Sequence, residues 1–347
     1  MSVLKADPVG WLLEPENPCV RYFTLREFLD YPERDSEVKD ARKSIRTYRR
    51  VSNILGKQRP EGYWGDAEQP YLPKYKSTYW QVMILSQLGL DKNDEHVRKA
   101  CEYVSRFQLE EGGFSAIGEK GVEREYSWLK NRSLKRGKRP PLFKTWAEER
   151  IREYEMSCLT GNVAASLIRF GYASDARVKK ALKWLVEIQS EDGGWLCPYW
   201  KAHIKDRHGC FMGTITPLDA FSELAEENRT PGIKEAIERG AEFLLTHRLF
   251  KADHHQFKII NEAWLELSFP CFFYDILRGL SVVARLGYAK DERLADALGI
   301  LLQKQNDDGK WILERTPSNM HITLETKGKP SKWITLRALQ VIKRVYS

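Results

Sequence analysis

Two kinds of apolar segment alternate along the chain and predict pairs of helices. The first kind is rich in apolar residues and poor in charge, as expected for helices that are buried on most sides. It covers residues 76–89, 155–171, 210–225, 270–287 and 331–345. The second kind carries apolar residues at helical spacing among many charges, as expected for helices with one wet face. It covers residues 92–108, 175–189, 232–246 and 290–304. The chain is therefore predicted to be a series of helical hairpins.

A short motif recurs between the predicted hairpins: a glutamine, three residues, a glycine, one residue and a large aromatic residue. Its four copies are Gln58-Gly62-Trp64, Gln108-Gly112-Phe114, Gln189-Gly193-Trp195 and Gln305-Gly309-Trp311. The last two glutamines are 116 positions apart, which is twice 58. A degenerate copy is therefore expected near His247, where the motif residues are lost. The glycine provides the left-handed residue that ends the amphipathic helix.

Hairpins of this kind can bury their apolar faces only against one another. They could stack as an open superhelix or close into a ring. The contrast between very apolar and strongly amphipathic helices favours closure, with the apolar helices forming an inner barrel. We therefore predict an all-α fold, an α/α toroid with an inner and an outer ring built from about five to six hairpins.

The glutamine-glycine-tryptophan repeat resembles the QW motif of squalene and oxidosqualene cyclases. The spacing of the hairpins is similar to that of the related protein prenyltransferase β subunits. The resemblance covers roughly residues 50–347. It implies a terpenoid-cyclase-like or prenyltransferase-like toroid, in which the motif glutamine caps a helix end, packs on the aromatic ring and ties neighbouring hairpins together. The motif therefore indicates a fold and does not indicate a reaction.

The motif divides the chain into two predicted parts. Residues 1–56 lack it and are predicted to form a helical extension packed on the toroid, which spans residues 57–347. An insertion at residues 116–150 lengthens the spacing from Gly112 to Gly193 to 81 residues. It is predicted to be an exposed loop. Its basic residues at 128–139 could contact acidic lipid or another anionic surface, or the loop could lie over the mouth of a cavity. Nothing else in the chain is typical of a nucleic-acid-binding module.

Composition and charge narrow the setting. The formal net charge is +8, from 56 Lys+Arg against 48 Asp+Glu, which favours anionic partners. Six cysteines without a tight spacing pattern are typical of a reducing compartment. The apolar patch at Trp11-Leu12-Leu13 is too short for a signal peptide, and no stretch is long enough to span a bilayer. We therefore expect a cytoplasmic protein.

The acidic motif of squalene-protonating cyclases is missing. The resemblance implies an Asp-x-Asp-Asp sequence at the mouth of the cavity, and this chain has none. Its one pair of adjacent aspartates, Asp307-Asp308, lies in a motif turn, where aspartate is a common turn residue. We therefore predict that the chain does not start a triterpene cyclisation by protonation.

The resemblance to protein prenyltransferases implies a zinc site instead. Those enzymes bind zinc through an Asp-x-Cys pair at the start of an inner helix and a histidine on the next one. Here Cys210 matches the cysteine, His208 stands in place of the aspartate, and Cys271 lies close to the position of the missing histidine. Cys158 opens the preceding inner helix, and the helix starts of a closed barrel share one end. These four residues are the predicted Zn²⁺ ligands. Unrelated buried cysteines are the alternative.

Two further sets of residues are candidates for ligand binding. Lys205 resembles a lysine that contacts a prenyl diphosphate, and with Lys201 and Arg207 it forms a basic cluster before a helix start, which suits an anion. The same cluster could be a solvated loop. The aromatic residues of the inner helices could line an isoprenoid cavity or pack as ordinary core. They include Trp80, Phe211 and Tyr274.

Three functions follow from these observations. The first is an enzyme or binder of isoprenoid diphosphates, a transferase or cyclase, with Cys210, His208 and Asp275 as candidate catalytic groups. The second is a carbohydrate-active hydrolase or lyase. Its candidate groups are Glu153, Glu155, Asp275 and His321. The third is a non-catalytic scaffold. Complement-type thioester domains share the toroid, but their Gly-Cys-Gly-Glu-Gln motif is absent here.

Overall fold

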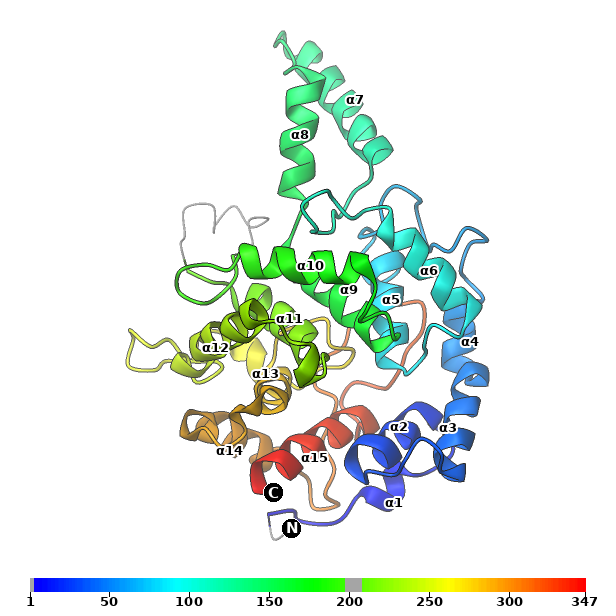
Figure 1. Ribbon diagram of the computed structural model, residues 1–347, viewed down its shortest axis with the longest axis vertical. Coiled ribbons are helices and arrows are strands. Elements are labelled where there is room, and N and C mark those ends of the chain that lie inside the picture. The colour runs from blue at the N-terminus through cyan, green and yellow to red at the C-terminus, as the bar shows by residue number, and fades with distance from the viewer. Residues whose placement is uncertain (1–2, 197–207) are drawn as a thin grey trace.

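The computed structural model describes residues 3–196 and 208–347. Within these ranges the chain is helical, with isolated β-bridges and no β-strand. Helices of an inner ring alternate along the chain with helices of an outer ring (Figure 1). The predicted all-α toroid is confirmed. None of the described helices is both long and apolar enough to cross a bilayer.

Six helical segments of the described chain form the inner ring. They are α2 (Pro18–Phe23, continued by the π-helical η1, Thr24–Phe28), α5 (Thr78–Gln87), α9 (Ser157–Arg169), α11 (Phe211–Ser222), α13 (Ile276–Val283, continued by the π-helical η5, Ala284–Tyr288) and α15 (Lys332–Tyr346). Packing contacts run from α5 through α9, α11, α13 and α15 to α2 and η1. The ring closes where Gly89, just after α5, lies against Phe23 of α2, so closely that a Cβ there would come within 3.2 Å of the ring.

The outer ring covers the apolar inner helices. It consists of α3 (Ser36–Thr47), α4 (Arg49–Leu55), α6 (Glu95–Ser105), α10 (Ala176–Glu187), α12 (Pro231–Thr246) and α14 (Ala295–Gln303). Shorter elements are α1 (Val9–Leu12) and the 3₁₀ turns η3 (Glu226–Asn228), η4 (Glu262–Leu265) and η6 (Glu292–Leu294). Asp94 and Asp175 cap the starts of α6 and α10 by accepting hydrogen bonds from backbone N–H groups. In α10, Val178 and Leu185 are buried while Lys179 is exposed, as the helical spacing predicts.

Three of the four copies of the repeated motif join their turn to the next outer helix. In one copy, Gln189 Nε2 donates hydrogen bonds to the Gly193 carbonyl at 2.7 Å and to the Ala236 carbonyl in α12 at 2.9 Å. Trp195 is fully buried, and its Nε1 donates to the Leu185 carbonyl at 2.7 Å. The glutamines of two other copies, Gln58 and Gln108, bond in the same way to the carbonyls of His96 and Arg177. The motif therefore fixes the position of one hairpin against the next.

The degenerate copy also marks a turn. The outer helix α12 ends at Thr246, and Arg248 and Leu249 follow with φ values of 45° and 69°. Phe250, just after them, is buried. The chain thus turns inward at the predicted position without the glycine that the other copies use.

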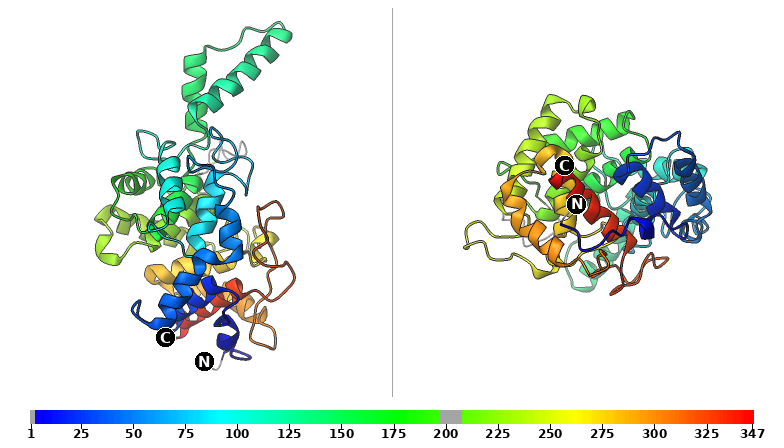
Figure 2. Two further views of the ribbon diagram at one scale, coloured as in Figure 1. Left: turned by 90° about the vertical axis from the view of Figure 1, so that its right-hand side faces the viewer. Right: turned by 90° about the horizontal axis from the view of Figure 1, so that it is seen from below.

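The first residues and the insertion differ from their predicted structures. Residues 1–56, expected to pack on the toroid as an extension, contribute α2 and η1 to the inner ring beside α15. The loop prediction for residues 116–150 is wrong. The segment forms two helices, α7 (Glu119–Lys135) and α8 (Phe143–Glu153), packed as a hairpin that projects from the toroid (Figures 1 and 2). Its many Glu, Lys, Arg and Leu residues favour helix, and Pro140-Pro141 separates the two helices.

Candidate functional site

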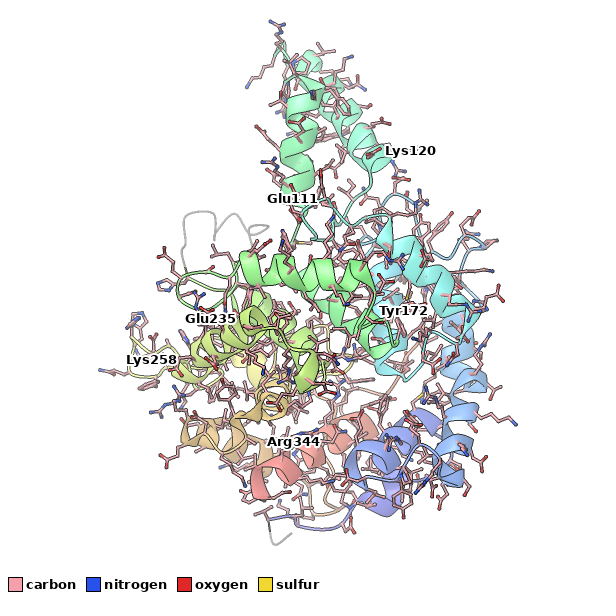
Figure 3. All side chains as sticks on the ribbon, viewed as in Figure 1. Glu111, Lys120, Tyr172, Glu235, Lys258 and Arg344 are labelled. Atoms are coloured by element: carbon pink, nitrogen blue, oxygen red, sulfur yellow. The ribbon has the colours of Figure 1, made fainter. Side chains whose placement is uncertain are left out.

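A cavity of about 300 Å³ lies between the inner helices. Gln87 and Arg169, the last residues of α5 and α9, line the cavity. Glu223, just beyond the end of α11, lines it as well. The C-terminal helix α15 lines it from Trp333 to Arg344, which is labelled in Figure 3. These two residues are eleven positions apart. At about 1.5 Å per residue the cavity therefore follows α15 for roughly 16 Å.

One part of the cavity wall is apolar. The ring centroids of Trp333 and Phe23 are 5.9 Å apart, and behind Trp333 the ring of Phe269 stacks on it at 4.6 Å. Leu336 and Val282 continue this wall. Contact with these side chains would remove apolar ligand surface from water, which is the main favourable contribution to binding a hydrocarbon chain.

Another part of the wall is a cluster of ion pairs around Asp219 of α11. Its carboxylate accepts hydrogen bonds from Arg285 at 2.6 Å, Arg169 at 2.7 Å and Arg278 at 3.2 Å. One turn later, Glu223 accepts a bond from Arg169 at 2.9 Å and also pairs with Arg285. Three guanidinium groups thus face two carboxylates, and the cluster joins the helices α9, α11 and α13 with its η5 extension.

The electrostatics of the cluster fix its protonation state. Burial raises the pKa of Asp219, but Arg169, Arg285 and Arg278 outweigh burial and hold that pKa well below its usual range. The same balance lowers the pKa of Glu223. Both groups are therefore carboxylates at neutral pH and cannot donate a proton. The Nε atoms of Arg278 and Arg285 are buried without a hydrogen-bond partner in the described structure.

Arg337 of α15 also lines the cavity. Its guanidinium contacts the Cys271 thiol, lies 3.4 Å from Gln87 Oε1 and sits 5.3 Å from the ring centroid of Phe269. No carboxylate is among its hydrogen-bond or ion-pair partners in the described residues. Burial, helped by the charge of Arg169, lowers the pKa of Arg337 to about 10, so the group is still a cation at neutral pH.

The charges on the cavity wall do not balance. Six arginines and four acidic residues line it among the described residues. They are Arg42, Arg169, Arg278, Arg285, Arg337 and Arg344 against Glu27, Asp91, Asp219 and Glu223. The cavity therefore carries an excess of two positive charges, which favours an anionic ligand.

The predicted zinc ligands do not gather at one place. The His208 side chain is 76% exposed and lies 3.8 Å from Asp192, whereas Cys271 is in the cavity beside Arg337. Cys158 and Cys210 are partly buried at the starts of α9 and α11. All four residues are described, and no three His, Cys, Asp or Glu side chains of the described chain are grouped as metal ligands. Within residues 3–196 and 208–347 the predicted ligands do not form a zinc site by themselves, and zinc binding stays a prediction.

Asp275 caps a helix. Its carboxylate caps α13 by accepting a bond from the Arg278 backbone N–H at 2.8 Å, and it also accepts one from the Ser268 N–H at 2.9 Å. Burial raises the pKa of Asp275 to about 6. The residue does not line the central cavity. The predicted anion ligands Lys201, Lys205 and Arg207 lie outside the described residues.

The predicted aromatic residues pack in two clusters. The ring of Trp80 lies 4.8 Å from that of Tyr75 and 4.9 Å from that of Phe272. The ring of Phe211 lies 5.2 Å from that of Tyr274, whose hydroxyl donates to a backbone carbonyl. Trp80, Phe211 and Tyr274 are not among the residues that line the central cavity. Their contacts are those of core packing around the starts of the inner helices.

The groups suggested for a carbohydrate site lie on separate elements. Glu153 pairs with Arg150 at 2.6 Å at the end of α8. Burial raises the pKa of Glu155, two residues further on. The ring of His321 lies 2.9 Å from the carbonyl of Lys76, and burial lowers its pKa.

The charged cavity residues were missed by sequence analysis, although a signal was present. Asp219 and Arg278 are each the one charged residue of a buried helix. A charged residue on a buried helix is rarely without a partner, so each predicts an opposite charge nearby. The partner itself depends on which helices are neighbours in the ring, and the spacing of the motif does not give that.

The chain is similar in sequence and structure to several known proteins. No family description matches the chain. In sequence it is similar to the terpene cyclase/mutase atnI of Arthrinium sp., at 21% identity over 254 residues, which is 67% of this chain. The chain spans about a third (32%) of the length of that relative.

Solved structures with a similar arrangement include a protein from Actinoplanes, with a TM-score of 0.47 and 15% identity over 95% of this chain and 90% of that one. They also include the type II terpene cyclase MstE from Scytonema. Its complex with the product merosterolic acid A gives a TM-score of 0.47 at 16% identity, covering 97% of both chains. Its complex with the substrate geranylgeranyl dihydroxybenzoate gives 0.48 at 16% identity, covering 95% of this chain and 87% of that one. The sequence similarity to atnI bears out the predicted resemblance to terpenoid cyclases.

Proposed function

We propose that this chain is a terpenoid-processing, cyclase-like protein that holds an isoprenoid with an anionic head group in its central cavity. The observation that carries the proposal is the position of Arg337, a cation without a carboxylate partner in the described structure, beside the apolar wall around Trp333. The sequence similarity to a terpene cyclase/mutase favours a terpenoid over other apolar ligands. The cavity volume lies at the lower end of the range of about 300–1,000 Å³ for small-molecule sites.

Each part of the wall has a role in this proposal. The planar guanidinium of Arg337 can bind a carboxylate or phosphate oxygen pair through two parallel hydrogen bonds. The isoprenoid chain packs along Phe23 and Trp333, whose faces can also stabilise a positive charge that develops on carbon. Asp219 and Glu223 are already paired and ionised, so they hold Arg169 and Arg285 in place.

The prenyltransferase-like alternative remains a second candidate. It is favoured by the predicted basic residues Lys201, Lys205 and Arg207 before α11, which suit a diphosphate. A zinc ion would supply Lewis-acid chemistry in such an enzyme. No step of the proposal here passes through zinc, because the described ligands do not gather.

Replacement of Arg337 tests the anion-binding role. Arg337→Gln is expected to weaken binding of farnesyl diphosphate by about 10- to 100-fold, because one charge-assisted interaction in a partly buried site is lost. Binding of farnesol, which has the same tail and no charge, is expected to stay the same. Isothermal titration calorimetry with both ligands measures the difference.

Arg315→Gln is the matched control. Arg315 also lies over a phenylalanine ring, 4.0 Å from the centroid of Phe273, but it does not line the cavity. Arg315→Gln should leave the affinities for farnesyl diphosphate and for farnesol unchanged. Leu336→Trp fills the cavity and should weaken both ligands together. Equal weakening of diphosphate and alcohol by Arg337→Gln, or no change at all, would refute the anion-binding role.

Zinc is tested by elemental analysis of the purified protein. The sequence-based hypothesis expects stoichiometric zinc in the unmodified chain and its loss in Cys210→Ala. Among the described residues, Cys210 and Cys271 belong to no group of three metal ligands. Metal-free protein that still binds farnesyl diphosphate would remove zinc from the function.

A further inference from the structure

The helical hairpin formed by α7 and α8 has a surface that the toroid does not use. Only Gly121 and Val122, at the start of α7, are buried in this helix, and α8 has no buried residue. The hairpin projects away from the rings (Figure 2), and Lys120 at the start of α7, labelled in Figure 3, marks its base. It is extra to the repeat, because the spacing from Gly112 to Gly193 is 81 residues instead of about 58. The hairpin therefore contributes little to the core of the fold.

Internal contacts make the hairpin a preformed element. Arg124 at its base pairs with Asp66 of the toroid at 2.9 Å. The ring of Tyr126 packs on that of Phe143 at 5.0 Å across the two helices, and its hydroxyl donates to the Pro141 carbonyl at 2.7 Å. The tip is thus held in one shape before any partner binds.

Charge is strongly concentrated at the tip. Residues 128–144, called the hairpin tip below, contain seven basic residues and no acidic residue, and all seven are exposed. They are Lys130, Arg132, Lys135, Arg136, Lys138, Arg139 and Lys144. The rest of the chain has 49 basic and 48 acidic residues, so the tip accounts for seven of the eight net positive charges. The basic pI of the protein is therefore a property of this one element.

Large apolar side chains lie among these charges. Leu142 is 74% exposed, Trp128 61%, Leu134 56% and Phe143 41%. Exposed apolar residues that are grouped together usually mark a binding surface. A surface that is both strongly basic and apolar fits the interface of an anionic bilayer, where the cations meet lipid phosphates and carboxylates and the apolar groups enter the acyl boundary. A nucleic-acid backbone would satisfy the cations and leave Leu134 and Leu142 in water.

We propose that the hairpin tip docks the protein on anionic lipid bilayers. The basic residues supply long-range attraction to the lipid head groups. The apolar side chains of Trp128, Leu134, Leu142 and Phe143 insert shallowly, so that electrostatic and apolar contributions to binding add up. This goes beyond the proposed function.

The test is co-sedimentation of the full chain with phosphatidylcholine vesicles that contain or lack phosphatidylserine. Strong binding is expected only to the vesicles that contain phosphatidylserine, and it should fall as salt is added. A charge variant of the tip should lose at least about 100-fold in partition onto the anionic vesicles, because each basic residue contributes to surface attraction. That variant carries Lys135→Ser, Arg136→Ser, Lys138→Ser and Arg139→Ser.

A control variant with the same net charge as the charge variant separates the role of the tip from that of the overall charge. It removes four exposed lysines elsewhere, with Lys179→Ser, Lys180→Ser, Lys234→Ser and Lys327→Ser. This control should bind vesicles nearly as well as the unmodified chain. If it loses as much binding as the charge variant, the tip is not the docking site. Circular dichroism and farnesyl diphosphate titration should give the same result for both variants, which separates this proposal from the ligand-binding one.

The apolar residues need their own variant. Leu134→Ser with Leu142→Ser keeps every charge and should reduce vesicle binding by about 10-fold or more, because buried apolar area is lost. Binding of single-stranded RNA is the comparison. If the apolar variant binds vesicles normally, or if the tip binds RNA more tightly than anionic vesicles at the same salt concentration, the bilayer proposal is wrong.

Discussion

Gly193→Ala is expected to lower the free energy of unfolding by at least about 3 kcal/mol. Gly193 has a φ of +86°, which an L-residue with a side chain adopts only at a cost. A Cβ at this position would also lie 2.4 Å from the Arg239 carbonyl oxygen of α12, which is backbone and cannot rotate away. The motif turn would have to move from the next outer helix, breaking the bonds of Gln189. Urea unfolding followed by circular dichroism measures the loss.

Gly299→Ala is the matched control. Gly299 lies inside the outer helix α14, and a Cβ there would meet no heavy atom within 4 Å. Alanine is the better helix former, so this variant should keep or raise stability by up to about 1 kcal/mol. Equal unfolding midpoints for the two variants would show that the motif glycine is not needed for its backbone conformation or its close approach.

The same contact explains why the fold could be predicted from sequence. Gly62, Gly112 and Gly309 also lie where a Cβ would clash with a backbone carbonyl of a neighbouring segment. In each copy the backbone of the turn lies against the backbone of a neighbouring segment. Only glycine fits there, so the motif recurs at a fixed spacing in the sequence. The closure of the ring was predicted from the contrast between apolar and amphipathic helices, because that contrast depends on burial alone. The structure confirms the repeated hairpins and the closed ring.

The insertion was misjudged for a different reason. Its charge and its departure from the 58-residue spacing predicted a loop, but neither property opposes a helix. Residues 119–135 are mostly good helix formers, and two exposed helices can hold each other through a few contacts such as Tyr126 with Phe143. Composition therefore predicted the exposure of the segment correctly and its secondary structure wrongly.

The candidate site could be predicted only in part. The apolar cavity wall follows from the inner helices, but the residues that give it charge come from separate hairpins. Arg169, Asp219 and Arg285 are each one residue on a different helix, and they meet because α9, α11 and the η5 extension of α13 are neighbours in the ring. The sequence shows the charges singly. Their pairing requires the order and rotation of the helices, which the repeat does not specify.

Asp219→Asn is expected to cost about 3–5 kcal/mol of stability at neutral pH, because it leaves buried guanidinium groups without their counter-charge. Asp219 is 3% exposed and accepts hydrogen bonds from Arg169, Arg278 and Arg285. The amide has nearly the same size, so packing is kept and the charge alone is removed. Three arginines would then face Glu223 as their remaining carboxylate in the cluster. Urea unfolding at several pH values measures the effect.

The pH dependence distinguishes this loss from a packing defect. The pKa of Asp219 in the folded chain is well below its unfolded value of about 3.9, so its contribution to stability is fully present above that unfolded value and is lost as the pH falls through the folded pKa. The difference between the unmodified chain and Asp219→Asn should therefore be constant from pH 7 to about pH 5 and shrink below about pH 4. Asp307→Asn removes a fully exposed carboxylate that pairs with the half-exposed Lys5, and it should change nothing measurable. A penalty for Asp219→Asn that stays the same in acid would show that shape, and not charge, holds the cluster together.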